Sequence, residues 1–148
     1  MKRASKKNVQ DLEHNKEVTR RFCLEVWGQG NAALADELLA QDLLDHTPFP
    51  TEVLGLEGHK QTLAMFRSAF PDLKTVVDDV MAEGDLTFLH WHGNATHTGS
   101  LMGIPPTGKA VRVTGMDILK MENGKIKERW AEVSSFQLMQ QIGVIPGG

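Results

Sequence analysis

The apolar residues of this chain follow a helical period as far as Pro71 and a strand-like period beyond it. Up to Pro71 they recur every three or four residues, which predicts amphipathic helices over residues 9–27, 31–40 and 57–70. Asn31 is a suitable N-cap for the second helix, and Pro71 would end the third. The first half of the chain is therefore expected to be helical.

The second half of the chain is predicted to form a sheet. Its strand-like runs cover residues 73–83, 86–97, 111–122 and 125–133. Asn123-Gly124 joins the last two runs and is a strong signal for a two-residue hairpin, while Gly84-Asp85 predicts a second tight turn. Strands joined in succession imply an antiparallel meander. Helices followed by a curved, mostly antiparallel sheet give an α+β fold.

The chain is predicted to form a single domain. A length of 148 residues suits one core, which we place in residues 9–148. Residues 1–8 would be a flexible basic tail, because no apolar run of the kind found in signal peptides follows them. A last short helix, capped by Ser134 or Ser135, would bring three apolar residues back against the body: Phe136, Met139 and Ile142.

The charge balance argues against two classes of partner. With 16 Lys and Arg against 19 Asp and Glu, the net charge of -3 indicates neither nucleic-acid binding nor binding to an anionic membrane. No apolar run approaches the ~20 residues of a membrane-spanning helix. Cys23 is the single cysteine, so no internal disulfide can form, and a reducing cytoplasm is the expected compartment.

Asp117 is the candidate centre of the chemistry. Alternation along its strand places it on one face with Val113, Gly115 and Leu119. A carboxylate among apolar residues is costly unless it has a partner or a chemical task. Gly115, which has no side chain, would leave room there for a ligand. A structural Asp that is salt-bridged to a nearby base remains the alternative, and the candidate bases are Arg112, Lys120 and Arg129.

The histidines offer further candidates. His90 and His92 share one strand face like a metal-binding pair, but no cluster supplies a third ligand, so no metal is expected. Trp91 and His97 would point to the opposite face, toward Asp117, unless a bulge near Gly93 intervenes. His46 lies in the segment Asp45 to Pro50, which the prolines should keep extended. It is a candidate orienting or proton-transfer group, or simply a packed loop residue.

The segment from His97 to Lys109 contains a spacing similar to that of a phosphate-binding loop. Its two prolines remove backbone donors, and a strand follows it in place of a helix, so phosphate binding is not expected. We interpret it as a stiff hairpin loop whose apolar residues Leu101, Met102 and Ile104 could form a lip over a cavity. Residues available to line that cavity include Trp27, Phe49, Phe66, Trp91, Met102, Ile104 and Trp130.

Taken together, several segments are similar to those of the SnoaL-like polyketide cyclase family, which has a cone-shaped α+β fold. The resemblance rests on residues 25–31, 45–50, 69–73, 97–109, 115–118 and 123–130. It implies a strongly curved sheet around an internal pocket, a homodimer packed through the sheet, and no metal or organic cofactor. It also implies that Asp117 is the general base and that His97 assists it. Many relatives have Asp where this chain has Ser134, and Glu132 is the nearby carboxylate.

Two functions remain open at this point. The first is a cofactor-independent cyclase, isomerase or lyase that acts on a small or polyketide-like apolar carbonyl compound, with Asp117, His97 and His46 in its site. The second is a non-catalytic protein that binds an apolar molecule. An ion pair between Asp117 and an Arg would favour this second function. The chain has no Tyr, which argues against ketosteroid-isomerase-like and scytalone-dehydratase-like sites. Epoxide hydrolysis would need a second Asp beside Asp117.

Overall fold

The computed structural model describes the backbone of residues 2–49 and 53–146, and the side chains of residues 11–49 and 53–146. Pro50, the end of the segment predicted to be extended, lies outside the described residues. The elements are α1 (Lys2–Arg21), η1 (Phe22–Trp27), α2 (Ala32–Leu38), β1 (Leu39–Asp45), α3 (Gly55–Ala69), β2 (Lys74–Glu83), β3 (Leu86–Thr96), β4 (Ala110–Glu122), β5 (Lys125–Val133) and α4 (Ser135–Gln141).

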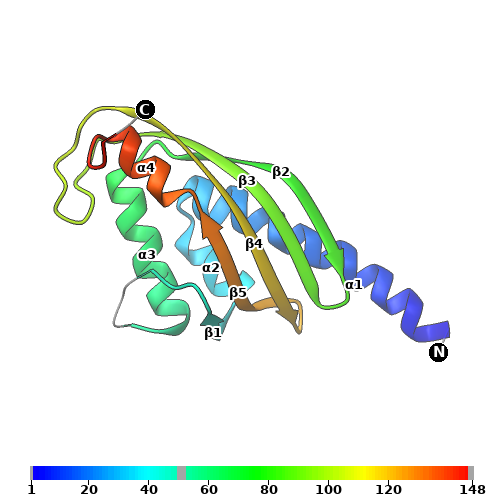
Figure 1. Cartoon of the computed structure of the whole chain (residues 1–148). Helices are drawn as coiled ribbons and strands as arrows, with labels where there is room; N and C mark the ends of the chain where they lie inside the picture. Colours follow the sequence, from blue (N-terminus) through cyan, green and yellow to red (C-terminus); the bar gives the residue numbers. More distant parts are fainter. Residues whose placement is uncertain (1, 50–52, 147–148) are drawn as a thin grey trace.

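The strands form one curved, unclosed sheet in the order β1-β5-β4-β3-β2. The strands from β2 to β5 pair antiparallel as a meander, as predicted, and β1 adds a parallel edge strand to β5. Figure 1 shows α1, α2 and α3 on the concave side of this sheet. The α+β architecture is therefore confirmed, with a sheet that wraps around helices without closing into a barrel.

The hairpin between β4 and β5 has the turn that the sequence predicts. Asn123 and Gly124 both have positive φ, 53° and 76°, as a type I′ turn requires. The register next to the turn pairs Glu122 with Lys125. Farther from the turn the register shifts between Lys120 and Met121, where β5 carries one extra residue, so the side chains of β5 beyond this bulge, including Arg129, change face relative to the turn.

The predicted end of the second helix is wrong. The second helix was expected to continue to residue 40, but it ends at Leu38, and β1 begins at Leu39. The N-cap is confirmed, since Asn31 Oδ1 accepts a hydrogen bond from the Leu34 N–H at 3.0 Å. Residues 39–45 are extended because they pair with β5, a long-range interaction that a local helical period does not reveal. This pairing places Asp45 next to Arg129.

Both chain ends of the domain differ from expectation. The first helix begins at Lys2, earlier than the predicted start at residue 9, and continues through the π-helical η1 to Trp27. At the other end, Leu138 and Ile142 of the last helical segment are buried in a core cluster. Phe136, which was expected to pack with them, is 57% exposed, because it lies on the opposite side of this helix.

Candidate active site

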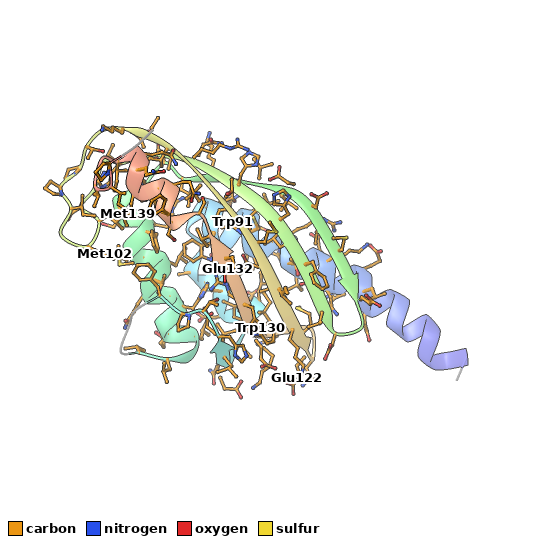
Figure 2. The ribbon with its side chains drawn as sticks, viewed as in Figure 1. Trp91, Met102, Glu122, Trp130, Glu132 and Met139 are labelled. Atoms are coloured by element: carbon orange, nitrogen blue, oxygen red, sulfur yellow. The ribbon has the colours of Figure 1, made fainter. Side chains whose placement is uncertain are left out.

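The concave side of the sheet encloses a cavity of about 430 Å³. Most of the side chains around it are apolar. The polar and charged ones come from β1, α3, the sheet and the neighbouring segments: Asp45, Thr47, His59, Thr62, Thr75, Asp117, Arg129, Glu132 and Ser135. Figure 2 shows Trp91 and Glu132 over the middle of the sheet, with Met102 and Met139 toward the end near α4. An apolar cavity with a few polar groups is typical of a small-molecule site.

Asp117 lies on the inner wall of this cavity, as the alternation of β4 predicts. Its side chain is 3% exposed, whereas its neighbour Met116 on the outer face is 66% exposed. Trp91 Nε1 donates a hydrogen bond to Oδ1 at 3.0 Å, and Arg129 Nε donates one to Oδ2 at 3.1 Å. Of the three bases that the sequence suggested as ion-pair partners, Arg129 is the one that pairs with Asp117.

Arg129 joins Asp117 to a second carboxylate. Its NH1 donates to Asp45 Oδ2 at 2.7 Å, and its side chain is 12% exposed. Burial alone would lower the pKa of the guanidinium, but the two carboxylates outweigh burial and raise that pKa. Asp45 could not be selected from the sequence as a partner of Arg129, because strand β1 was not predicted. The lack of a second Asp, which argued against epoxide hydrolysis, is therefore no longer an objection.

Gly115 does not make room for a ligand. It lies directly opposite Trp91 in the pairing of β3 with β4. A Cβ atom added to Gly115 would come within 2.5 Å of the Trp91 indole. The glycine is therefore needed to let the indole pack across the strand and reach Asp117.

His59, on α3, is a cavity residue that sequence reasoning did not select. It is 6% exposed, and its Nε2 accepts a hydrogen bond from Trp27 Nε1 at 3.2 Å. Burial, together with the nearby charge of Arg129, lowers the pKa of the imidazole from 6.5 to about 3, while Asp45 opposes the shift. Only its place among the apolar residues of the third predicted helix hinted at an inward orientation.

The structure does not bring His97 to Asp117. Strand β3 ends at Thr96, and His97 is buried beyond it, with its ring 5.3 Å from that of Phe70. Its Nδ1 lies 3.0 Å from Thr107 Oγ1 and accepts from the Thr107 N–H at 3.3 Å. Within the described part of the chain, His97 is not among the residues that line the cavity.

His46 and Trp130 lie on the outer side of the sheet. Their rings stack at 4.3 Å, and His46 Nε2 is 2.9 Å from Glu128 Oε1. Trp130 is paired with Ile118, whose side chain also faces outward, and neither His46 nor Trp130 lines the cavity. The strand alternation that turns Arg129 inward turns its neighbour Trp130 outward.

Most of the other predicted ligand-contacting residues do line the cavity: Trp27, Phe49, Phe66, Trp91, Met102 and Glu132. Ile104 does not line it, because it packs against the core cluster that contains Leu101. The predicted apolar lip therefore consists of Met102, whose φ of 47° lies in the left-handed region.

His90 and His92 also lie on the outer face. His90 Nδ1 is 3.0 Å from Asp79 Oδ2, and His92 Nδ1 is 2.8 Å from Asp78 Oδ2. Among the residues that the structure describes, no three His, Cys, Asp or Glu side chains come together as metal ligands would. In the same residues, none of the helices combines the length and the apolar character needed to cross a membrane.

A curved, open sheet around helices and a mostly apolar cavity with buried charges defines a cone-shaped α+β protein with an internal pocket. Within that class, the chain belongs to the SnoaL-like polyketide cyclase family, whose model matches residues 17–142. The resemblance seen in the sequence is thereby confirmed. No protein of curated function matches the chain in sequence.

Several solved structures share this fold. TsrD of Streptomyces laurentii is 25% identical with a TM-score of 0.81, and the match covers 90% of this chain and 97% of that one. AclR of Streptomyces galilaeus, described as a candidate hydroxylase, is 25% identical with a TM-score of 0.81 and coverages of 93% and 85%. IdmH of Streptomyces antibioticus, described as a candidate polyketide cyclase, is 25% identical with a TM-score of 0.77 and coverages of 87% and 98%.

Proposed function

We propose that this protein is a cofactor-independent enzyme that removes a proton next to the carbonyl group of a small or polyketide-like apolar compound. The enolate formed in this way would then close a ring, isomerise or eliminate, as in a cyclase, isomerase or lyase. The observation that carries the proposal is the position of Asp117. This carboxylate is buried at the wall of an apolar cavity and has a donor on each oxygen.

Asp117 can still accept a proton in this position. A carboxylate has about four lone-pair sites, and the bonds from Trp91 and Arg129 occupy one on each oxygen. The two donors hold the carboxylate in a single orientation, which favours proton transfer from a substrate carbon in a defined place.

Arg129 makes the change of charge on Asp117 tolerable. When Asp117 takes a proton it becomes neutral, and a buried guanidinium without a counter-charge would be costly. Asp45, 2.7 Å from Arg129 NH1, supplies that counter-charge throughout. The ion pair with Arg129 is therefore compatible with a base that alternates between charged and neutral forms.

The substrate class follows from the other lining residues. Trp27, Phe49, Phe66 and Met102 present aromatic and sulfur-containing surfaces that suit an apolar carbon skeleton. Glu132 borders the cavity but is paired with Met116, so its side chain turns toward the outer face and is given no role here. His97 and His46 have no part in this proposal, because neither lines the cavity. Solved structures that share this fold are described with different activities, so the fold alone does not determine the reaction.

The proposal is tested by hydrogen–deuterium exchange next to a carbonyl group. The protein is incubated in D₂O with the apolar ketones 1-tetralone and 2-acetylnaphthalene, and loss of the α-proton signals is followed by NMR. We expect the protein to accelerate exchange and Asp117→Asn to lower the enzymatic rate by about 100-fold or more, the usual contribution of a general base. Full exchange activity in Asp117→Asn would contradict the proposal.

A binding protein is the second candidate function. The ion pair between Asp117 and Arg129 is the observation that favours it, because a salt-bridged Asp can serve the structure alone. On this alternative, both ketones bind in the cavity, as followed by quenching of Trp fluorescence, but neither exchanges its α-protons faster than in buffer. Catalysed exchange with either ketone would exclude the alternative.

We also propose that two copies of the chain associate through the outer face of the sheet. Apolar side chains are exposed on that face, among them Val76, Met116 and Ile118. Light scattering after size-exclusion chromatography is expected to give twice the chain mass of 16.4 kDa and to give the single mass for Met116→Lys. A monomer at micromolar concentration in the unmodified protein would contradict this proposal.

A further inference from the structure

His59 is held in one orientation at the wall of the cavity. Trp27 Nε1 donates to its Nε2, and the rings of Trp27 and Phe22 each lie 5.5 Å from the imidazole. Trp27 itself is held by the chain around it, because the Arg67 side chain donates to the carbonyl oxygens of Trp27 and Leu73. The position of the imidazole is therefore set by packing and by a hydrogen bond.

The hydrogen bond from Trp27 determines the tautomer of His59. An indole N–H can only donate, so Nε2 of His59 must carry a lone pair. The imidazole is then neutral, with its single proton on Nδ1. Burial and the charge of Arg129 act in the same direction, since they lower the pKa of this histidine to about 3.

The Nδ1–H of His59 is free to bind a ligand. Among the described residues, none accepts a hydrogen bond from it, and the residue lines the cavity. Among the described residues, the side-chain nitrogen that is both fully buried and without a hydrogen-bond partner is Nε2 of His97. Nδ1 of His59 is not such an atom, so it is accessible from the cavity. A buried N–H without a protein partner is costly unless a ligand or water satisfies it.

We infer that His59 is a further catalytic residue, whose neutral Nδ1–H donates a hydrogen bond to the carbonyl oxygen of the substrate, and that Trp27 is its positioning residue. This inference rests on the proposed function and names the group that would receive the developing charge. An imidazole that is fixed and neutral gives a directed donor without adding another positive charge beside Arg129.

In the proposed step, Asp117 takes a proton from the substrate and His59 stabilises the charge that develops. The C–H bond next to the carbonyl breaks, and its proton moves to an oxygen of Asp117. The electron pair forms the carbon–carbon double bond of the enolate, and the negative charge moves to the carbonyl oxygen. The Nδ1–H of His59 stays on nitrogen and strengthens its hydrogen bond to that oxygen as the negative charge develops.

The experiment combines spectroscopy with the exchange assay. The probe is 2-acetylnaphthalene with ¹³C at the carbonyl, and its infrared stretching frequency is measured when bound to the protein and to His59→Phe. We expect a lower frequency in the unmodified protein, loss of that shift in His59→Phe, and an exchange rate lower by about 100-fold, as for loss of one oxyanion donor. His14→Gln, a substitution at an exposed position of α1, is the matched control and should change neither readout.

Two further measurements keep the inference testable if His59→Phe does not fold. In the ¹⁵N NMR spectrum of the unmodified protein, His59 should show a protonated Nδ1 and an unprotonated Nε2 from pH 5 to pH 8. In Trp27→Phe the Nε2 loses its donor, and we expect a mixture of tautomers and a weakened carbonyl shift. A proton on Nε2 in the unmodified protein would overturn the inference.

The outcomes separate this inference from the proposed function. If the carbonyl frequency is the same in His59→Phe while Asp117→Asn abolishes exchange, the donor role is wrong and the base survives. If Asp117→Asn exchanges normally, the proposed function is wrong, and a carbonyl shift that still depends on His59 would mark a ligand-binding contact only.

Discussion

The inner and outer faces of the sheet both hold carboxylates next to basic side chains, at nearly the same distances. On the inner face Arg129 lies 3.1 Å from Asp117, and on the outer face His90 lies 3.0 Å from Asp79. The two pairs differ in burial, because the side chain of Asp117 is 3% exposed and that of Asp79 is 67% exposed. Burial, not contact distance, therefore distinguishes the candidate site from a surface ion pair.

Burial changes what each pair does. In water, an exposed pair gains little, and salt screens it. In the cavity, Asp117, Arg129 and Asp45 lose most of their water and depend on one another. The inner group should therefore contribute more than the outer pairs both to the stability of the fold and to any chemistry.

The largest effect on stability is expected for Arg129→Met. This substitution removes the cation between the buried Asp117 and the half-buried Asp45 and leaves both carboxylates without a counter-charge, which costs about 3–5 kcal/mol. On the outer face, His90→Gln should change stability by no more than about 0.5 kcal/mol. Urea denaturation of both variants measures the difference. Equal destabilisation by the two substitutions would show that burial does not separate the faces.

A smaller loss is expected for Gly115→Ala. The added methyl group would overlap the Trp91 indole, and forcing extra atoms into packed space costs about 1–3 kcal/mol. The indole would also move away from Asp117, so the exchange of 1-tetralone should slow. Lys120→Gln, on the outer face of the same strand, is the control. An unchanged midpoint of urea denaturation in Gly115→Ala would mean that Trp91 does not fill this space.

The stability of the protein should depend on pH through His59. The pKa of His59 is about 3 in the folded protein and 6.5 when unfolded, so between these values the unfolded chain binds more protons, and stability falls as the pH is lowered. Each unit of pH in this range corresponds to about 1.4 kcal/mol, so going from pH 7 to pH 5 should cost about 2 kcal/mol through His59.

His59→Phe tests this prediction, since it should remove that part of the pH dependence while exposed histidines such as His90 remain. Urea denaturation at pH 7 and pH 5 gives the two free energies of unfolding. The account of a buried, neutral imidazole fails if the unmodified protein and His59→Phe lose the same amount of stability on acidification.

The orientation of Asp117 could be predicted because it depends on local signals. The turn at Asn123-Gly124 marks the hairpin that joins β4 to β5, and alternation along β4 turns Asp117 inward and Met116 outward. These signals lie within a few residues of one another. The meander from β2 to β5 and the inner position of Asp117 are accordingly as the sequence predicts.

The partners of Asp117 could not be predicted with the same certainty, since they depend on contacts between distant segments. Asp45 reaches Arg129 only because β1 pairs in parallel with β5, across 84 residues of chain. His97, in contrast, is close to Asp117 in the predicted pattern but lies beyond the end of β3, where the strand alternation no longer applies. The Trp27–His59 contact joins two helical segments whose packing a periodic pattern does not specify.

The central claim, that the buried carboxylate of the inner face is the base, is tested most directly by two matched substitutions. Asp117→Asn and Asp79→Asn each replace a carboxylate by an amide of the same shape, and the rate of α-proton exchange in 1-tetralone is measured for both. We predict a loss of about 100-fold or more for Asp117→Asn and an unchanged rate for Asp79→Asn. Full activity in a folded Asp117→Asn protein would contradict the account.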